Sequence, residues 1–283
     1  MDISLIIATR DRSHQLARCL ASVARIEFER PWELIVVDNG SNDATAEVVK
    51  QFADKASFPL RYVLEPGPGL GNAHNAGVAV ARGEVLAFTD DDCYPETDFL
   101  KRIWSAFVDP SIGYIAGRIT LHDPADYPIT TIESITPYTF RPKCLVTTGS
   151  FGGANMAFRR KVLLGIGGFD PLFGPGALFN AEDVDAAARA SALGWKGVYR
   201  PDVIVRHHHR RKASDVPRLL KSYAIGAGAY HMKLLLSGHE FLWFVRSVYQ
   251  TAHRYRFSRR MILWEPIGGL KYACIYLLQL LRG

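Results

Sequence analysis

Apolar runs and helix-like patterns alternate along the first third of the chain. Four short runs of apolar residues predict buried strands, at Ile3–Ala8, Leu34–Val37, Leu60–Leu64 and Val85–Phe88. Between them, apolar residues recur every three or four positions and predict helices over Ser13–Val23, Thr45–Phe52 and Ala73–Ala81. Strands that are apolar throughout and alternate with helices are typical of a mostly parallel sheet covered on both faces. The pattern therefore predicts an α/β fold.

The pattern changes after the first third. Residues 117–148 are rich in Pro, Thr and Tyr and show no clear period, so no element is assigned there. Asn155–Phe158 is strand-like, and the stretch "NAEDVDAAARASALGW" predicts a helix that begins near Glu182 and Asp183. The stretch "KGVYRPDVIVRHHH" predicts a pair of strands that ends in three histidines. Helical spacing then resumes at Leu219, Leu220, Tyr223, Ala227, Tyr230 and Leu234.

Charge divides the chain into two parts. The net charge is +6, but the residues from Arg206 onward hold 14 Lys and Arg against 3 acids, a net +11, and the remainder sums to −5. A mildly acidic body with a strongly basic C-terminal segment indicates two parts with different roles. The 283 residues suffice for one large domain with an appended segment. Four scattered cysteines without a CxxC pair favour a reducing compartment and argue against structural zinc.

Neither end of the sequence shows a targeting or spanning pattern. The N-terminus "MDISLIIATR" has no basic n-region and no small-residue cleavage site, so it does not read as a secretory signal. No apolar run reaches the ~20 residues that span a bilayer. We therefore expect a cytoplasmic protein that is peripheral at the inner face of the membrane.

Polar clusters follow three of the predicted strands. They are Thr9-Arg10-Asp11, Asp38-Asn39-Gly40-Ser41 and Asp90-Asp91-Asp92. Ligands of open parallel sheets bind at the carboxyl ends of the strands, so these clusters mark a candidate site. In an extended chain Asp90 and Asp92 face one way and Asp91 the other, which makes Asp91 the dispensable member. Paired carboxylates suit Mg²⁺ or Mn²⁺, although a solvated turn or a cap before residues 96–100 explains the acidic run equally well.

The remaining motifs are individually weak. Glu182 and Asp183 either cap their helix or act in a site, and His207, His208 and His209 either stabilise the fold or bind a metal. The glycines of "GPGLGN" at 67–72 lack the third glycine of a dinucleotide fingerprint. No nucleophile elbow, P-loop or Cys–His pair is present in the sequence.

Taken together, these segments resemble the family 2 glycosyltransferases, which have the GT-A fold with a Rossmann-like sheet. The resemblance runs from Ile3 to about His209 through "SLIIATRDR", "ELIVVDNGSNDAT", "GLGNAHNAGVAVARGEVLAFTDDDCYP" and the stretch from Gly152 to His209. It implies a catalytic domain over 1–209, with a nucleotide-sugar half (1–116) and an acceptor half (117–209), followed by a helical segment over 210–283. Two positions depart from the family pattern: Asn39 replaces a second aspartate, and His74 replaces an arginine that contacts the diphosphate.

The resemblance also implies roles for individual residues in an inverting, metal-assisted transfer from a nucleotide-diphosphate sugar to a hydroxyl of a glycan, lipid-linked or other acceptor. Asp183 would be the general base, with Glu182 and Gly152 on the acceptor side. Asp92 would bind Mn²⁺ or Mg²⁺ with His207 or His209, and Asp38 would hold the base of the nucleotide. The nucleotide-sugar would contact Ala8, Thr9, Arg10, Asp11, Arg12, Asp38, Asn39, Gly69, Asn75, Asp90, Asp91 and Gly153.

The basic C-terminal segment interleaves cationic and apolar residues. It contains Arg210, Arg211, Lys212, Arg254, Arg256, Arg259 and Arg260 together with Trp243, Phe244, Trp264 and the run Tyr272–Leu281. This composition suits an anionic membrane surface, with packing on the body or a dimer interface as the alternatives. It is more apolar than nucleic-acid binding requires. A nucleotidyltransferase would carry a Gly-rich first loop, which "ATRDRSHQL" lacks, and a non-catalytic sugar- or membrane-binding relative would be expected to lose the metal or base carboxylates.

Overall fold

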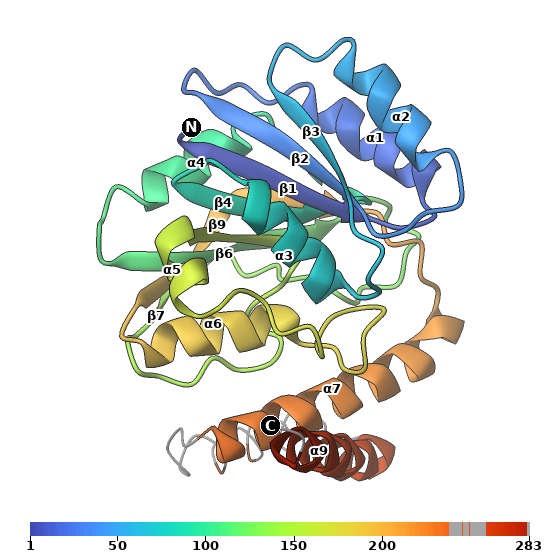
Figure 1. Ribbon diagram of the computed structural model, residues 1–283, viewed down its shortest axis with the longest axis vertical. Helices are drawn as coiled ribbons and strands as arrows, with labels where there is room; N and C mark the ends of the chain where they lie inside the picture. Colours follow the sequence, from blue (N-terminus) through green and yellow to red (C-terminus); the bar gives the residue numbers. More distant parts are fainter. Residues whose placement is uncertain (238–244, 246–248, 250–258, 282–283) are drawn as a thin grey trace.

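The computed structural model shows the predicted alternation of strands and helices (Figure 1) and describes residues 1–237, 245, 249 and 259–281. Its first half runs β1 (Ile3–Thr9), α1 (Ser13–Val23), β2 (Trp32–Asp38), α2 (Thr45–Ala53), β3 (Leu60–Leu64), α3 (Leu70–Val80), β4 (Val85–Asp90), β5 (Cys93–Pro95) and α4 (Phe99–Ala106). The second half runs β6 (Ile112–Leu121), β7 (Tyr138–Phe140), β8 (Asn155–Arg159), α5 (Arg160–Gly165), α6 (Glu182–Ala192), β9 (Lys196–His207), a 3₁₀ turn (Ala213–Asp215), α7 (Val216–Leu236) and α9 (Arg259–Leu280).

The strands of the described residues form one mixed sheet in the order β3-β2-β1-β4-β8-β6-β9-β5, with β7 beside β9. The four strands of the first third are parallel, as their apolar pattern predicts. In the second half β8 runs antiparallel to both β4 and β6, whereas β6 and β9 are parallel. The α/β class is confirmed, and the sheet contains more antiparallel pairing than the sequence pattern indicates.

One prediction in this half was wrong: β9 is a single long strand and not a pair. Its register against β6 shifts between Arg200 and Ile204, so the Pro201-Asp202 step is accommodated as an irregularity inside one strand. The first part of β9 pairs with β7 and its last residues pair with β5. Its carboxyl end thereby reaches the same edge as the aspartate run.

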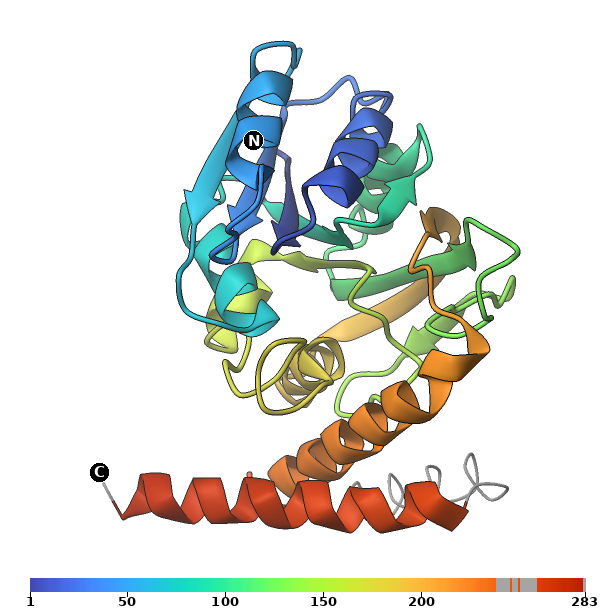
Figure 2. The same ribbon diagram turned by 90° about the vertical axis from the view of Figure 1, so that its right-hand side faces the viewer.

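Two apolar cores lie on opposite faces of the sheet. One core packs α1, α2 and α4 against the sheet, and the other packs α3, α5 and α6 against it (Figures 1 and 2). Strand β1 shows the cause, because Ile6 belongs to one core while Leu5 and Ile7 belong to the other. A strand buried on both faces must be apolar at every position, which is the pattern that the sequence shows.

Helix α7 packs on the body of the protein, and α9 lies beyond it (Figures 1 and 2). Lys233 of α7 forms ion pairs with Asp170 (2.7 Å) and with Asp185 of α6 (2.6 Å). A Cβ on Gly226 would lie 2.6 Å from the carbonyl oxygen of Asn180, so α7 reaches this position only with glycine. Of the tail residues singled out above, Trp243, Phe244, Arg254 and Arg256 lie outside the described residues, as do the side chains of Arg259 and Arg260. In the described ranges, no helix combines the length and apolarity needed to cross a membrane.

Candidate active site

Sheet register brings the polar strand ends to one level. Ala8 of β1 is paired with Asp90 of β4, and Thr9 is paired with Asp38 of β2. Both pairings are parallel, so the residues that follow these strands leave the sheet at the same edge. The convergence predicted from the sequence is therefore present in the fold.

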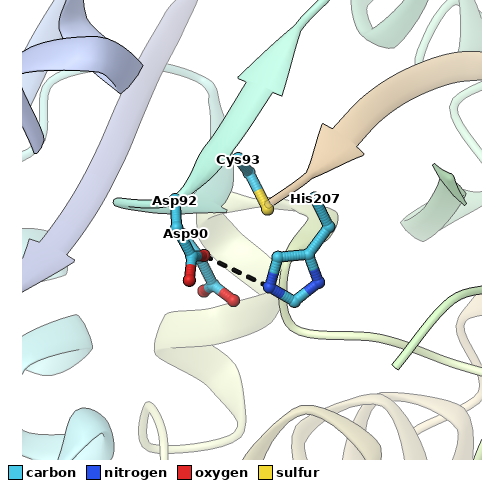
Figure 3. Close-up of side chains that lie close together, drawn as sticks. All are labelled: Asp90, Asp92, Cys93 and His207. Carbon is cyan, nitrogen blue, oxygen red and sulfur yellow. Dashed lines mark ion pairs between the residues drawn. The ribbon is translucent and has the colours of Figure 1, made fainter. Parts of the chain in front are cut away.

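The other side of the site is built by the end of β9. Cys93, which begins β5, is paired with His207 across an antiparallel ladder, and the His208 N–H donates to the Asp92 carbonyl (2.9 Å). This pairing brings the His207 imidazole to the aspartate run, with Nε2 3.2 Å from Asp92 Oδ1 (Figure 3). Burial lowers the pKa of His207, but the hydrogen bond and charge of Asp92 outweigh burial and leave that pKa raised.

These side chains fit a hard divalent cation. One ligand atom each from Asp90, Asp92, Cys93 and His207 lies within 4.8 Å of the others (Figure 3). Among the described residues, His207 Nδ1 is buried without a hydrogen-bond partner, and Asp92 Oδ1 is buried with His207 Nε2 as its contact. Burial raises the pKa of the Cys93 thiol, which stays neutral and is a poor ligand for Mg²⁺ or Mn²⁺. Two carboxylates and an imidazole therefore form the candidate metal site.

His209, the other predicted metal ligand, is not in this group. Its Nδ1 accepts a hydrogen bond from the Arg211 N–H (3.0 Å) and lies 3.9 Å from the buried Asp126 carboxylate. In a continuous strand, His209 would face the same side as His207. However, β9 ends at His207, and Arg210 adopts a positive φ of 59° in the turn that follows. The turn therefore directs His209 toward Asp126.

Asp91 is not part of the Asp90–Asp92–Cys93–His207 group, and it has partners of its own. Its Oδ2 accepts a hydrogen bond from the Thr9 hydroxyl (2.7 Å), and its Oδ1 lies 2.8 Å from Arg12 Nη1. The Arg12 guanidinium also contacts the Asp92 carboxylate through Nη2. Burial raises the pKa of Asp91 to about 7, opposed by Arg12. That Asp91 is dispensable stays a prediction, and removing Asp91 would leave the partly exposed Arg12 guanidinium with Asp92 as its remaining contact in this cluster.

A second pair of carboxylates begins α6. Ala181, just before it, has φ of 95°, a left-handed conformation that is strained for a residue with a Cβ. The Asp183 carboxylate accepts a hydrogen bond from the Val184 N–H (2.7 Å). Burial raises the pKa of Asp183 to about 6, although the N–H groups of Val184 and Gly153 oppose the shift. Burial likewise holds the pKa of Glu182 well above its usual range.

One cavity of about 590 Å³ joins the two carboxylate groups. Its nucleotide-side wall contains these predicted residues: Ala8, Thr9, Arg10, Arg12, Asn39, Asp90, Asp91, Asp92 and His207. The opposite wall contains Gly152, Gly153, Glu182 and Asp183. A carboxylate–imidazole cluster and a separate carboxylate with a raised pKa therefore face the same space.

Four other predicted residues lie outside the lining of this cavity, each because its polar groups are engaged elsewhere. The buried Asp38 carboxylate accepts hydrogen bonds from the Ser41 N–H (2.7 Å) and the Tyr62 hydroxyl (2.6 Å). Asp11 is exposed and accepts from the Asn42 N–H (2.7 Å). Both amide atoms of Asn75 bond the backbone of Phe169 (2.8 Å each), and Gly69 precedes α3 with its N–H on Asn39 Oδ1 (3.2 Å).

His74 is also a core residue and is not part of the cavity lining. It lies between the rings of Phe88 and Phe169, with both centroid separations at 4.9 Å, and is 1% exposed. Burial lowers the pKa of His74 to about 3, so the imidazole is neutral at physiological pH. The cationic contact expected at this position of the family pattern is therefore absent from residue 74.

Sequence reasoning missed the residues that α7 and the preceding turn contribute. Arg211, Tyr223 and Ala227 line the cavity, as do Thr130 and Thr131 from the segment without a clear pattern. Tyr223 does stand in a recognisable stripe, followed by the small residues Ala224, Gly226 and Ala227. A polar-tipped aromatic residue beside small residues is the available signal, but its spacing alone predicts only a helix face.

Comparisons with known proteins identify the family of the chain. Residues 4–166 match the family model described as Glycosyl transferase family 2. The chain is 26% identical over 236 residues to "Glycosyltransferase AglE" of Haloferax volcanii, covering 82% of this chain and 74% of that protein. Several further curated relatives are matched over only about half of their length.

Solved structures, among them the following two, share the fold. The "Mannosyltransferase PcManGT from Pyrobaculum calidifontis in complex with GDP-Man and Mn2+" superposes with a TM-score of 0.68 at 21% identity, covering 96% of this chain and 75% of the other. "S. aureus TarS 1-349 in complex with UDP-GlcNAc" superposes with a TM-score of 0.67 at 18% identity, covering 92% and 74%. At these identities the similarity establishes the fold.

Proposed function

The chain belongs to glycosyl transferase family 2 and has the GT-A fold, and from this premise we propose that it is an inverting enzyme with Asp183 as the general base. The donor would be a nucleotide-diphosphate sugar and the acceptor a hydroxyl of a glycan, lipid-linked or other molecule. The observation that carries the proposal is the single cavity in which Asp183 faces the Asp90–Asp92–His207 cluster.

The base follows from the environment of Asp183. With a pKa of about 6 it is mostly ionised at neutral pH, yet it is a stronger base than an ordinary aspartate. It would take the proton of the acceptor hydroxyl as that oxygen bonds to the anomeric carbon. The bond from this carbon to the diphosphate breaks with its electron pair on the leaving oxygen. Attack opposite to the leaving group inverts the anomeric configuration.

The diphosphate end is served by Asp90, Asp92 and His207, which would hold Mn²⁺ or Mg²⁺. When bound, the cation neutralises charge that develops on the leaving diphosphate. Asp92 is suited to binding, because contacts with His207 and Arg12 outweigh burial and hold its pKa well below the usual range. It is therefore ionised over the whole working range of pH.

Two glycines let the backbone form part of the cavity wall between these groups. A Cβ on Gly153 would lie 3.4 Å from Glu182 Oε1, and a Cβ on Gly152 would lie 2.8 Å from Ile119 Cδ1. Side chains here would crowd the carboxylates and fill space beside them. We assign this stretch to the position of the transferred sugar.

Helix α7 belongs to the catalytic unit in this proposal, although the resemblance to the family implies a domain boundary at residue 209. Arg211 and Tyr223 line the cavity, and the pKa of Tyr223, raised by burial to about 12, also responds to Arg211, Asp183 and Glu182. Tyr223 therefore lies near the base. We assign it to the acceptor side.

Helix α9 would contact an anionic membrane surface. Leu263, Leu270 and Leu277 are between 57% and 68% exposed, and their spacing places them along one side of the helix. The segment that contains them holds the excess of +11 charge. Leu277→Asp should reduce co-sedimentation with vesicles containing anionic phosphatidylglycerol, whereas Leu193→Asp, an equally exposed leucine after α6, should not. Equal binding of both variants would refute the membrane contact.

The central experiment is a donor screen. GDP- and UDP-sugars are incubated with the full chain and Mn²⁺, and release of the nucleoside diphosphate is measured with and without EDTA. We expect release from at least one donor, abolished by EDTA. An absence of both release and donor-induced thermal stabilisation across the whole set would refute the proposed function.

A further inference from the structure

The aspartate run concentrates negative charge in a buried part of the protein, where the charge needs a positive partner. Asp91 and Asp92 are 2% and 3% exposed, and Asp90 adjoins them at the end of β4. Adjacent carboxylates in a poorly hydrated site repel one another unless a cation lies between them. In the described residues, the guanidinium that directly contacts two of these carboxylates is that of Arg12.

The Arg12 guanidinium bridges Asp91 and Asp92. Nη1 lies 2.8 Å from Asp91 Oδ1, and Nη2 donates to Asp92 Oδ2. Its planar fork can engage two carboxylates together, which a lysine ammonium does less well. The two aspartates are therefore held by one cation that comes from the loop between β1 and α1.

The bridge occupies a carboxylate that the proposed metal needs. Asp92 presents one oxygen to Arg12 and the other to His207. A divalent cation bound by Asp92 would compete with Arg12 for this carboxylate and would also repel the guanidinium. Arg12 lines the cavity, and its side chain is 38% exposed, so it has open space on the side where a donor would bind.

We propose that Arg12 is a built-in counter-ion of the aspartate run, which divalent metal must displace from Asp92, and that the displaced guanidinium then binds the diphosphate of the donor. This inference rests on the proposed function for the identity of the donor. It makes metal and nucleotide binding cooperative, because the metal releases a cation for the nucleotide. It also supplies from Arg12 the positive contact that His74 does not provide.

The first test measures Mn²⁺ affinity without nucleotide, by titration calorimetry or by the electron paramagnetic resonance signal of free Mn²⁺. Arg12→Gln removes the competitor and the repulsion, so Mn²⁺ should bind about tenfold more tightly, equivalent to about 1.4 kcal/mol. The Mn²⁺ affinity of Arg12→Lys should lie between those of Arg12→Gln and the wild type. If Arg12 only held the carboxylates in place, Arg12→Gln would weaken Mn²⁺ binding, and that result would overturn the inference.

The matched control is Arg10→Gln. Arg10 lines the same cavity and lies 3.8 Å from Asp11, so its removal costs the same unit of charge without touching the aspartate run. Mn²⁺ affinity should then change less than about twofold, since the charge is more distant and screened. An equal effect of both variants would show a general charge effect and would refute a specific role for Arg12. A thermal melt of each variant verifies folding, and Arg12→Lys provides the reading if Arg12→Gln does not fold.

The second test uses GDP and UDP as separate probes. With Mn²⁺ present, Arg12→Gln should weaken the preferred nucleotide at least about fivefold; without metal, the change should stay below about twofold. Equal losses under both conditions would overturn the cooperative part of the inference. Neither measurement requires turnover. The two proposals can fail separately. If Arg12→Gln binds Mn²⁺ more tightly than the wild type, but the wild type neither transfers sugar nor is stabilised by any donor, the proposed function is refuted and the counter-ion role stands.

Discussion

Replacing the proposed base should both abolish transfer and stabilise the fold. The pKa of Asp183 is raised by burial from 3.8 to about 6, which shows that the folded state resists its ionisation. A carboxyl with a raised folded-state pKa contributes its full stability below the unfolded pKa and loses it as pH rises through the folded value. Asp183 is therefore a source of instability above pH 6, and Asp183→Asn removes it.

The size of this effect follows from the shift. About two pKa units correspond to about 3 kcal/mol of unfolding free energy at pH 8. In the wild type the two oxygens of the Asp183 carboxylate accept from the N–H groups of Val184 and Gly153, and asparagine keeps only one of these oxygens. The lost acceptor reduces the gain in unfolding free energy by about 1–2 kcal/mol. We expect a net gain of about 1–2 kcal/mol at pH 8, or an increase of about 2–8 °C in melting temperature. The gain should vanish at about pH 5 and become a loss at lower pH, because the effect of the pKa shift then falls below the cost of the lost hydrogen bond.

The assay pairs thermal melts from pH 4 to 8 with nucleoside diphosphate release. In the wild type, kcat/KM should rise with pH through about 6 as Asp183 ionises, and Asp183→Asn should show no activity at any pH. Asp185→Asn is the control on the same helix, because it breaks ion pairs with Arg189 and Lys233 and should destabilise the fold. An Asp183→Asn variant that is less stable than the wild type at pH 8, or that transfers sugar, would refute the reasoning.

Three further outcomes are expected. Asp92→Ala should weaken Mn²⁺ binding by about 100-fold or more in calorimetry and abolish transfer; normal turnover of this variant in EDTA would contradict the metal role. Tyr223→Ala should lower acceptor-dependent kcat/KM by about tenfold without changing donor affinity, and Tyr223→Phe should lower it less; a selective loss of donor affinity would move Tyr223 to the nucleotide side. His74→Phe should keep activity. Because the pKa of His74 in the folded state is about 3, the wild type should lose stability as pH falls below about 6.5, and the variant should lose less when both are unfolded with urea. If the two proteins lose stability equally in acid, His74 is not buried in its neutral form.

The sequence predicts the strand ends well and the facing of single residues poorly. Alternating apolar strands and helices require parallel pairing, and pairing brings Thr9, Asp38 and Asp90 to one edge. Whether Asp38 or the adjacent Asn39 faces the cavity depends on how the chain leaves β2, a matter of one residue. Here Tyr62 and Ser41 bind Asp38, and Asn39 lines the cavity.

Contacts between distant elements explain the rest. The rotation of α3 is set by Phe88 and Phe169, so His74 and Asn75 are directed into the body. Helix α7 contributes to the cavity wall because it packs against the loop before α6. No local sequence pattern predicts this packing. The same applies to Arg12, since its partners lie about 80 residues further along the chain.

The crossing of α7 and α9 constrains how this chain can be recombined with its relatives. A Cβ on Gly228 would overlap the carbonyl oxygen of Glu265, and one on Gly268 would overlap that of Ile225, so the two helices touch backbone to backbone. Helix α7 carries Tyr223 into the cavity while its glycines receive α9. A chimera joined at residue 209 would exchange the part of the cavity wall that α7 contributes together with the tail. Grafts that preserve the cavity wall must keep α7 with the body and replace α9 only with helices that retain a glycine at the crossing.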